Sequence, residues 1–506
     1  MVKVWVVMLS VLLAGLFLGN TDRAVDKIQE ARIAETAREM VVDRNWLVPH
    51  YNGEVRLQKP PLTYWLTAAS YQIFGINERA VRLPSALFAI GASWLMFVWV
   101  RRETSAQIAI SAVLVLGTSF LGLRYFRSGE ADAALLFFIA LACASGFSLI
   151  EAKTKSAVYI LKCSLVFMLA LGLGFLTKGP AGIAIPLLSV TIYAFSTKNL
   201  RALKAIFNPW AVAIFFAVAF AWYVWILLKM PDLAQQFFGK QIDETFVSGT
   251  HKQPIYWYLV HAIEFFAPWS LLLIPAGIWS YKHRPLPKLV YFSLIWLGVV
   301  FVLLTLTVNK QTQYALLFAP PIAILIAYYL EVATDKFYQF NRIIFWLLCV
   351  ATVAIVVFAI KKHGLAAMAS PVWLLILFMP FALKKAFKST LPSNPVLIVA
   401  VLATFGYLFV EQFLSKDAAK DDIKILMQSA QIKSQLYQER PGNGAISFYA
   451  KRPINPLDKQ AVTKLLANND QLWLVSKSKP SFPQIDANAE KTVGKWTLWK
   501  ITKQQY

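Results

Sequence analysis

The sequence predicts a polytopic α-helical membrane protein of about thirteen transmembrane helices, with a small α/β domain at its C-terminal end. The chain of 506 residues is 58% hydrophobic and only 15% charged, which leaves too little polar surface for a water-soluble fold of this size. Runs of about 18 or more apolar residues recur, each long enough to cross a bilayer core as a helix. The runs are continuous rather than alternating, and this excludes a membrane β-barrel.

The thirteen predicted spans follow the apolar runs. The first run, after Val2-Lys3, has two interpretations, a cleaved signal peptide or a retained span. A retained span is favoured because Gly19-Asn20 lacks the small-x-small ending of a cleavage site and many spans follow. The expected spans lie near 3–19, 84–100, 107–123, 132–150, 160–177, 180–196, 209–228, 262–280, 289–307, 313–331, 343–360, 371–383 and 395–413.

Basic residues give the expected orientation, because Lys and Arg accumulate in cytoplasmic loops. Every second short loop is basic, as at Arg101-Arg102, Lys198 and Lys282. We therefore expect a multi-pass protein of a bacterial inner membrane with its N-terminus in the cytoplasm. Loops 20–83 and 229–261 and the C-terminal segment then face the periplasm.

Two domains are expected. Residues 1–415 carry the spans together with the first periplasmic loop, and residues 416–506 form a soluble periplasmic domain. In this tail a helical pattern over 421–438 alternates with strand-like segments at 445–450, 471–477 and 495–501. The tail is therefore predicted to be a small mixed α/β domain.

Charge and cysteine content exclude some function classes. The net charge of +23 fits cytoplasmic loops and anionic headgroups, so membrane lipids are expected partners and nucleic acid is not. Cys143, Cys163 and Cys349 lie in or beside apolar runs and show neither metal-ligand nor disulfide spacing. Polar residues gather in the outward loops, and no repeated halves of the kind found in transporters are evident. This pattern favours chemistry at the membrane surface.

A charged helix is expected shortly after the first span, over residues 27–40. Its apolar residues recur at helical spacing, while Asp22, Asp26 and Glu30 repeat every four residues on another face. The pattern is typical of an amphipathic helix that lies along the membrane surface. A solvated acidic face is the alternative interpretation.

Lys59 follows in the same loop, directly before Pro60 and Pro61, which prevent a helical continuation there. A lysine fixed by such a turn above the membrane could meet a lipid phosphate. The alternative is an interfacial lysine whose ammonium group reaches the water layer.

Further charges are expected on the same outward side. Arg127, Glu130 and Asp132 lie at the mouth of a predicted span, where acids facing lipid would be costly, so they are expected to face a cavity or a partner. Lys178 and Lys310 flank other spans on this side. Several cations with acids among them suit a site that binds a phosphate and transfers a group from it.

Seven segments, in a consistent order over about residues 1–415, resemble the GT-C membrane glycosyltransferases. The most similar branch is that of aminoarabinose lipid A transferase and the related protein mannosyltransferase-like enzymes. The segments are EARIAETAREM, WLVPHYNG, QKPPLTYWL, RAVRLPSAL, LTKGPAGIAIPLL, APWSLLLIP and NKQTQYALLFAPP.

The resemblance implies a thirteen-span enzyme that moves a sugar from a polyprenyl-phosphate donor of the undecaprenyl type. The acceptor would be a lipid A-like or other envelope molecule at the periplasmic face. Lys59 matches the lysine of the family's Glu-Lys-Pro-Pro motif and is the first candidate for the donor phosphate. Further candidates are Arg82, Arg127, Lys178 and Lys310. The aromatic residues Trp222, Tyr223, Trp225, Trp257 and Tyr258 could line the lipid groove or form an ordinary interfacial belt.

The sequence departs from the family at two acidic positions. Gln29 stands where the family has the Asp of an Asp-Glu pair, and Gln58 where it has the Glu before the lysine. An amide can neither take a proton nor bind a divalent metal strongly. Three explanations remain open: an acceptor that is already an anion, a carboxylate supplied by Glu30, Asp26 or Asp132, or lipid binding without turnover.

The family's metal site is doubtful for the same reason, because it uses the glutamate replaced by Gln58 together with a histidine. His251 is a weak metal candidate, and His261 is a further histidine of the same loop. No cofactor is firmly expected. Two other function classes remain alternatives to the enzyme: a transporter or flippase of lipid-linked sugars, and a non-catalytic envelope protein that binds them.

Overall fold

The computed structural model describes residues 23–25, 27–152, 156–232, 252–332, 393–409 and 422–503, with short gaps in the last range, and isolated positions between 343 and 361. The expected spans near 3–19 and 371–383 lie outside these residues, and that near 343–360 is described only at single positions. The chain divides into two compact units. Unit 1 comprises 1–19, 58–60 and 85–414, and unit 2 comprises 20–57, 61–84 and 415–506.

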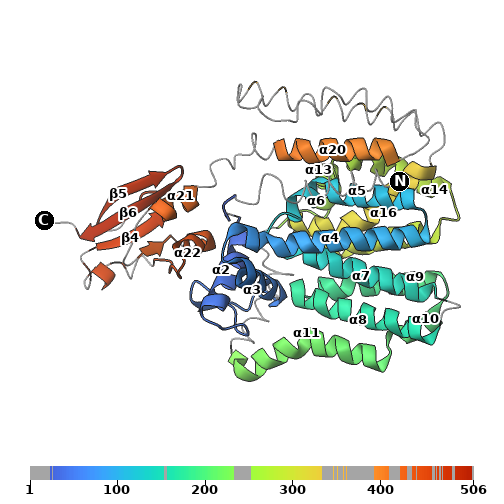
Figure 1. Ribbon diagram of the computed structural model, residues 1–506, viewed down its shortest axis with the longest axis horizontal. Coiled ribbons are helices and arrows are strands. Elements are labelled where there is room, and N and C mark those ends of the chain that lie inside the picture. The colour runs from blue at the N-terminus through green and yellow to red at the C-terminus, as the bar shows by residue number, and fades with distance from the viewer. Residues whose placement is uncertain are drawn as a thin grey trace. The chain divides into compact units, whose positions relative to one another are not determined.

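Unit 1 is a bundle of apolar helices (Figure 1). Among the described residues, six helices are long and apolar enough to cross a membrane, or up to seven if one bent pair counts as a span. The helices are α4 (Glu78–Glu103, which begins in unit 2), α5 (Ala106–Thr118), α6 (Phe120–Tyr125), α7 (Asp132–Ile150), α8 (Ala157–Lys178), α9 (Ala181–Ser196), α10 (Leu200–Ile206), α11 (Pro209–Lys229), α13 (Trp257–Phe265), η1 (Trp269–Leu272), α14 (Leu273–Lys282), α15 (Lys288–Leu306), η2 (Thr312–Phe318), α16 (Ala319–Val332) and α20 (Ser393–Phe409).

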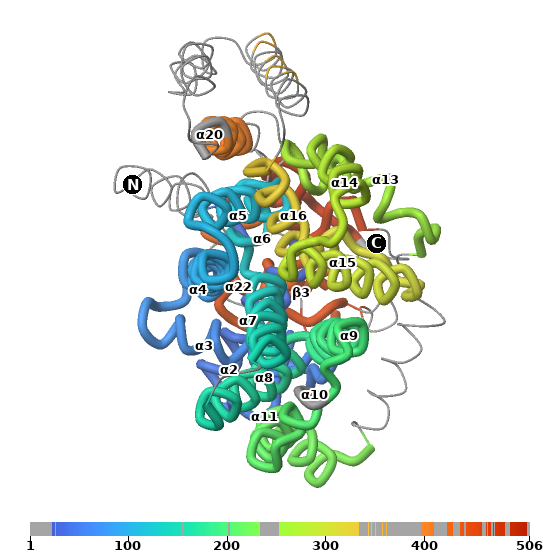
Figure 2. The backbone as a smooth tube through the Cα atoms, turned by 90° about the vertical axis from the view of Figure 1, so that its right-hand side faces the viewer, coloured from blue at the N-terminus to red at the C-terminus, as the bar shows by residue number. Residues whose placement is uncertain are grey.

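The helices differ in how much protein covers them. In α7 89% of the most apolar window is buried, whereas in α11 the figure is 28%. Figure 2 shows α7 beside α8 and α9, with α11 at the rim next to α8. The central helices therefore bury their apolar side chains against protein, and α11 presents most of its surface outward, as a lipid-facing span would.

Two of the predicted spans are interrupted. The expected span at 107–123 breaks at Ser119, which ends α5 and caps α6 by accepting a hydrogen bond from Gly122 N at 3.2 Å. The expected span at 262–280 is two helical segments bent by 115°. The breaks bind each other, because Phe120 N donates to Ala267 O at 2.8 Å and Trp269 Nε1 donates to Thr118 Oγ1 at 3.1 Å. Backbone groups freed in an apolar bundle need such partners.

A helical hairpin sets the position of Lys178. Gly179, at φ +86°, ends α8 directly after Lys178, and α9 returns along it. Gly174 and Gly182 let the two backbones touch, since a Cβ on Gly182 would lie 2.3 Å from the carbonyl carbon of Gly174. The close contact between α8 and α9 that these two glycines allow therefore holds the end of α8 in place.

Unit 2 joins the first loop to the C-terminal segment. It contains α2 (Ile28–Val42), a hairpin of β1 (His50–Tyr51) and β2 (Glu54–Val55), α3 (Leu62–Phe74), α21 (Asp422–Ser429), β3 (Leu436–Gln438), α22 (Gly444–Ala450), β4 (Gln471–Ser476), β5 (Ile485–Val493) and β6 (Trp496–Lys503). The sheet order is β3-β4-β6-β5, with β3 parallel to β4 and the other pairs antiparallel. In Figure 1 these strands and α21 lie together.

The secondary structure of the tail corrects two predictions. Segment 445–450 is the helix α22 rather than a strand, because Asn443 caps it by accepting from Ala445 N at 3.0 Å. Residues 436–438, expected at the end of a helix, form strand β3. The strands predicted at 471–477 and 495–501 are confirmed as β4 and β6, and the helix over 421–438 is confirmed in its first part as α21.

One apolar core joins the two parts of unit 2. Helix α2 packs on both α3 and α22, and Ala31, Ala34 and Met40 share a cluster with Ile446 and Phe448. The expected surface helix is thus enclosed, and its three glutamates are buried rather than solvated. The first loop, expected to belong with the spans, shares its core with the C-terminal segment.

Replacing Gly182 with alanine should destabilise the bundle by about 1–3 kcal/mol, because the new methyl group meets backbone that cannot move aside. The matched control is Gly298→Ala in α15, where the added methyl group meets nothing within 4 Å. Thermal unfolding in detergent measures both. Equal melting temperatures for the two variants would contradict the close contact.

Candidate functional site

An ion pair lies at one end of the unit 1 bundle. Lys178 Nζ, at the end of α8, donates to Asp132 Oδ1, at the start of α7, at 2.5 Å. The Asp132 side chain is 2% exposed and that of Lys178 is 13% exposed. Lys178 Nζ also lies 4.8 Å from the centre of the Tyr314 ring in η2, which is close enough for a cation–π contact. Asp132 therefore faces a partner, as its position predicted.

The loop between α6 and α7 brings two more charged residues to this end. Arg127 and Glu130 are both buried there. The backbone carbonyl of Glu130 accepts from Ser85 Oγ of α4 at 2.9 Å, and the Arg127 guanidinium lies 5.8 Å from the ring centre of Tyr407 in α20. The loop is thus held by helices that are distant in the sequence.

Lys310 supplies another buried cation, between α15 and η2. It is 5% exposed, and its Nζ donates to Thr307 O at 2.6 Å. Among the residues that the structure describes, no carboxylate pairs with it. Burial lowers the pKa of Lys310. Since η2 packs on α6 and α7, this ammonium group belongs to the same end of the bundle and has capacity to bind an anion.

The opposite end of the bundle carries the basic loops predicted to be cytoplasmic. There Glu151 accepts from Tyr193 at 2.8 Å and from Lys288 at 2.5 Å, and Arg102 donates to Ser148 at 2.6 Å. The cluster of Asp132, Lys178, Arg127, Glu130 and Lys310 is therefore separated from these loops by the length of the helices. We call it the outer cluster.

In unit 2 the structure pairs two candidates with each other. Arg82 Nε donates to Glu30 Oε1 at 2.8 Å, and Arg82 Nη2 donates to Glu30 Oε2 at 3.1 Å. Arg82 also donates to the carbonyls of Arg23 and Ala24 at 2.9 and 3.3 Å. Glu30 is 1% exposed and Arg82 6%. Both oxygens of Glu30 thus accept hydrogen bonds from Arg82.

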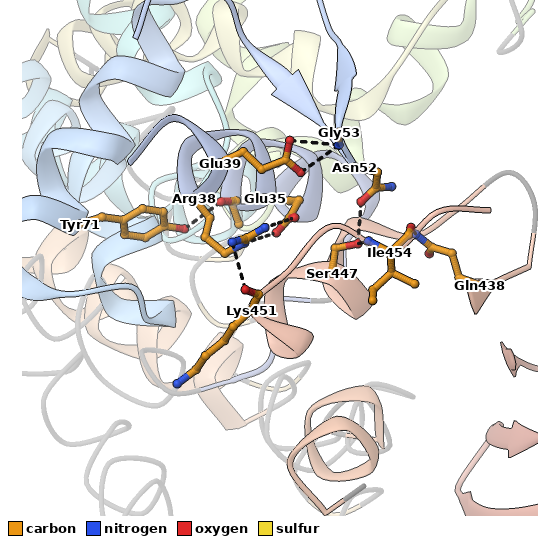
Figure 3. A network of polar contacts seen from close by, with 11 residues as sticks. Glu35, Arg38, Glu39, Asn52, Gly53, Tyr71, Gln438, Ser447, Lys451 and Ile454 are labelled. Carbon is orange, nitrogen blue, oxygen red and sulfur yellow. Dashed lines mark hydrogen bonds and ion pairs between the residues drawn. The ribbon is translucent and has the colours of Figure 1, made fainter. Parts of the chain in front are cut away.

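A second polar network holds α2 against α22 (Figure 3). Glu35 and Arg38 form two hydrogen bonds of 2.7 and 2.8 Å, and Arg38 Nη1 donates to Lys451 O at 3.2 Å. Glu39 accepts from the backbone N–H of Gly53 in the β1–β2 turn at 3.1 Å. Burial raises the pKa of Glu35 to about 8, although Arg38 acts in the opposite direction.

The remaining predicted positions differ in burial. Lys59 is half-buried and Gln58 exposed in unit 1, while Gln29 is half-buried on α2 in unit 2. Pro60 and Pro61 are buried, and α3 begins directly after them. Asp26 and His251 lie outside the described residues.

The residues present do not fit the family's metal site. Gln58 offers an amide where that site needs a carboxylate. His261 Nδ1 lies 2.9 Å from Trp257 O, one turn earlier in α13, and the histidine ring packs beside Trp257 and Phe265. Within the described ranges, no group of three His, Cys, Asp or Glu side chains could hold a metal ion.

The aromatic residues fall into two groups. Trp222, Tyr223 and Trp225 lie on α11, which packs on α8, whereas Trp257 and Tyr258 lie on α13, which packs on η1 and η2. Tyr314 and Tyr407, which contact the cations of the outer cluster, were missed by sequence reasoning. The NKQTQY segment around Tyr314 was a signal for the first, and Tyr407 lies in an apolar run that gave none.

Comparison with known proteins supports the resemblance. Residues 58–225 match the family described as dolichyl-phosphate-mannose-protein mannosyltransferase. The chain is 30% identical over 313 residues to an undecaprenyl phosphate-alpha-4-amino-4-deoxy-L-arabinose arabinosyl transferase of Edwardsiella ictaluri, a match covering 61% of this chain and 56% of that relative. An uncharacterized protein of Aquifex aeolicus is 26% identical, with 90% of this chain and 88% of the relative covered.

The fold agrees with the sequence. The crystal structure of ArnT from Cupriavidus metallidurans bound to undecaprenyl phosphate superposes with a TM-score of 0.83, at 19% identity and 98% coverage of both chains. This chain is similar to the GT-C membrane glycosyltransferases, of the aminoarabinose-transferase and protein-mannosyltransferase type. The predicted GT-C resemblance is thus confirmed, and the protein is an α-helical membrane protein with this fold.

Removing the cation of the buried Asp132–Lys178 pair should destabilise the protein. We expect Lys178→Met to cost roughly 3–5 kcal/mol, because it leaves the Asp132 carboxylate buried without its partner. The double variant Lys178→Met, Asp132→Leu should recover much of the loss. Unfolding in detergent measures both, and the exposed Lys282→Met serves as control. A single variant as stable as the control would show that the pair does not hold the helices.

Glu35 should make stability depend on pH. Its pKa is raised to about 8 from 4.5, so the folded state binds the proton more tightly, and this stability is full below 4.5 and lost as pH rises through about 8. Glu35→Gln should remove this contribution, so the free energy of unfolding should change less with pH between 4.5 and about 8, by up to about 1.4 kcal/mol per pH unit. The exposed Glu54→Gln should keep the wild-type slope. Identical slopes in all three proteins would contradict the prediction.

Proposed function

We propose that the protein transfers a sugar from a polyprenyl-phosphate donor to a lipid A-like or other envelope acceptor at the periplasmic face of a bacterial inner membrane. The observation that carries the proposal is the outer cluster, where Arg127, Lys178 and Lys310 are gathered with two acids at the end of the bundle opposite the basic loops. The named activity of the Edwardsiella ictaluri relative, which uses an undecaprenyl phosphate sugar, supports a donor of this class.

In this reaction the cations would stabilise the leaving group, which is the polyprenyl phosphate. An oxygen of the acceptor attacks the anomeric carbon, and the bond from that carbon to the phosphate oxygen breaks, leaving its electron pair on the polyprenyl phosphate. Cations that gain contact as this charge develops lower the barrier. Lys310, which donates only to a carbonyl among the described residues, and Lys59, at the family's lysine position, are our first choices for this role.

We assign the carboxylate facing the acceptor to Asp132. Gln29 and Gln58 are amides, and both oxygens of Glu30 accept from Arg82, so neither motif offers a ready base. Asp132 differs from Glu30 in that, among the described residues, only its Oδ1 accepts a hydrogen bond, from Lys178, which leaves Oδ2 to face the acceptor. An acceptor hydroxyl would give its proton to Asp132, whereas an acceptor phosphate would need only orientation.

A second candidate function is the binding of polyprenyl-phosphate sugars without turnover. It is favoured by the two amides and by the engagement of Glu30 with Arg82. It uses the same outer cluster but no proton acceptor, and an activity assay separates it from the enzyme.

Purified protein incubated with undecaprenyl-phosphate sugars and lipid A should consume the donor, as followed by mass spectrometry of the lipids. Lys59→Ala should lower kcat/KM by about 10²- to 10³-fold, as does loss of one group that stabilises transition-state charge. Asp132→Asn should lower it by about 10²- to 10⁴-fold with a hydroxyl acceptor. Lys282→Ala, at the opposite end of the bundle, should be unchanged.

The outcomes are distinct. Donor binding without consumption across a panel of sugars and acceptors would favour the second candidate. Undiminished transfer in both Lys59→Ala and Asp132→Asn would remove our assignment of the site while leaving the reaction class intact.

A further inference from the structure

The C-terminal domain reaches the Glu30–Arg82 pair through one hydroxyl group. Tyr449 of α22 accepts a hydrogen bond from Val25 N at 2.8 Å and donates to Glu78 Oε1 at 3.1 Å. Val25 directly follows Ala24, whose carbonyl accepts from Arg82, and Glu78 lies one turn before Arg82 on α4. The hydroxyl thus joins the two chain segments that carry the pair.

Lys424 adds a second contact from the same domain. Its Nζ, on α21, lies 2.7 Å from Glu78 Oε1, the oxygen to which Tyr449 donates. Glu78 is therefore held by two residues that follow it by more than 300 positions in the sequence. It is the first residue of α4, and fixing it fixes the turn that presents Arg82.

Burial raises the pKa of Tyr449, so the hydroxyl stays protonated and remains a donor to Glu78. The ring itself packs beside Phe448, which contacts Tyr71 of α3. The aromatic ring and the hydroxyl group are thus separable: phenylalanine keeps the packing and loses both hydrogen bonds.

We propose that Tyr449 and Lys424 are positioning residues, through which the C-terminal domain holds Val25 and Glu78 so that Glu30 and Arg82 keep their paired geometry. The functional part of this inference rests on the proposed sugar transfer, in which Arg82 is a candidate for the donor phosphate and Glu30 holds Arg82 in place. The C-terminal domain is then a working part of the enzyme rather than an appended module.

The test compares Tyr449→Phe and Lys424→Met with wild type in the full-length protein. Transfer from undecaprenyl-phosphate sugar should fall by about tenfold in kcat for Tyr449→Phe, the size expected when one or two hydrogen bonds near charged groups are lost, with little change in KM for the donor. Tyr437→Phe is the matched control, since Tyr437 is a half-buried tyrosine on β3 of the same domain. It should keep wild-type kcat.

A readout without activity accompanies the assay. Hydrogen exchange should show faster exchange at the amide of Val25 in Tyr449→Phe, and unchanged exchange there in Tyr437→Phe. Lys424→Arg should rescue the kcat lost in Lys424→Met, because it restores the cation beside Glu78. Faster exchange at Val25 in Tyr449→Phe, with no sugar transfer by wild type or any variant, would support the positioning contact and contradict the proposed function. Wild-type exchange and wild-type kcat in Tyr449→Phe would overturn the inference.

Discussion

Charge inside an apolar bundle needs a polar partner, and the end of unit 1 that carries Asp132 and Lys178 is organised by this constraint. Asp132 at the start of α7 forms an ion pair with Lys178 at the end of the neighbouring α8. The tight hairpin at Gly179 keeps Lys178 in position for this contact. An unpaired carboxylate at this depth would cost more than the helices gain by packing around it. The loop carrying Arg127 and Glu130 and the segment carrying Lys310 can then gather at the same end without exposing charge to lipid.

The same constraint acts differently in unit 2. There the buried charges lie on α2, and their partners come from the start of α4, from the β1–β2 turn and from the carbonyl that ends α22. Glu30 and Glu39 are each bonded by a group more than ten positions away in the chain, and Glu35 is bonded by Arg38 one turn along the same helix. Arg38 in turn donates to the Lys451 carbonyl, so the polar groups of α2 link the first loop to the tail.

Hydropathy predicted the apolar helices that the structure describes, because the length and composition of an apolar run can be measured without knowing what packs against it. The interruptions could not be predicted in this way. Ser119 caps α6, but the backbone N–H of Phe120 that the break leaves without a helical partner donates to Ala267, almost 150 residues later, and hydropathy does not report that contact. The apolar alternation of segment 445–450 suits a strand, but Asn443 caps a helix there, and that helix packs on the distant α2.

The candidate site was predictable to the same degree. The resemblance pointed to Glu30, Arg82 and Lys178 by their motifs, and the position of Asp132 at the mouth of a predicted span pointed to that residue. The structure adds which of them bind one another. That Glu30 pairs with Arg82 and Asp132 with Lys178 follows from three-dimensional packing, which residue spacing in a single sequence does not contain.

The enclosure of α5 has a consequence for how the protein is made. Every residue from Ile108 to Thr118 is buried, and the helices that cover it include α16 and α20, which the ribosome completes roughly 200 to 300 residues later. At 13 residues, α5 is too short to cross a bilayer by itself. Its stable insertion must therefore wait for later helices, so this segment would remain dependent on the insertion machinery during synthesis, whereas α11 could partition into lipid as soon as it emerges.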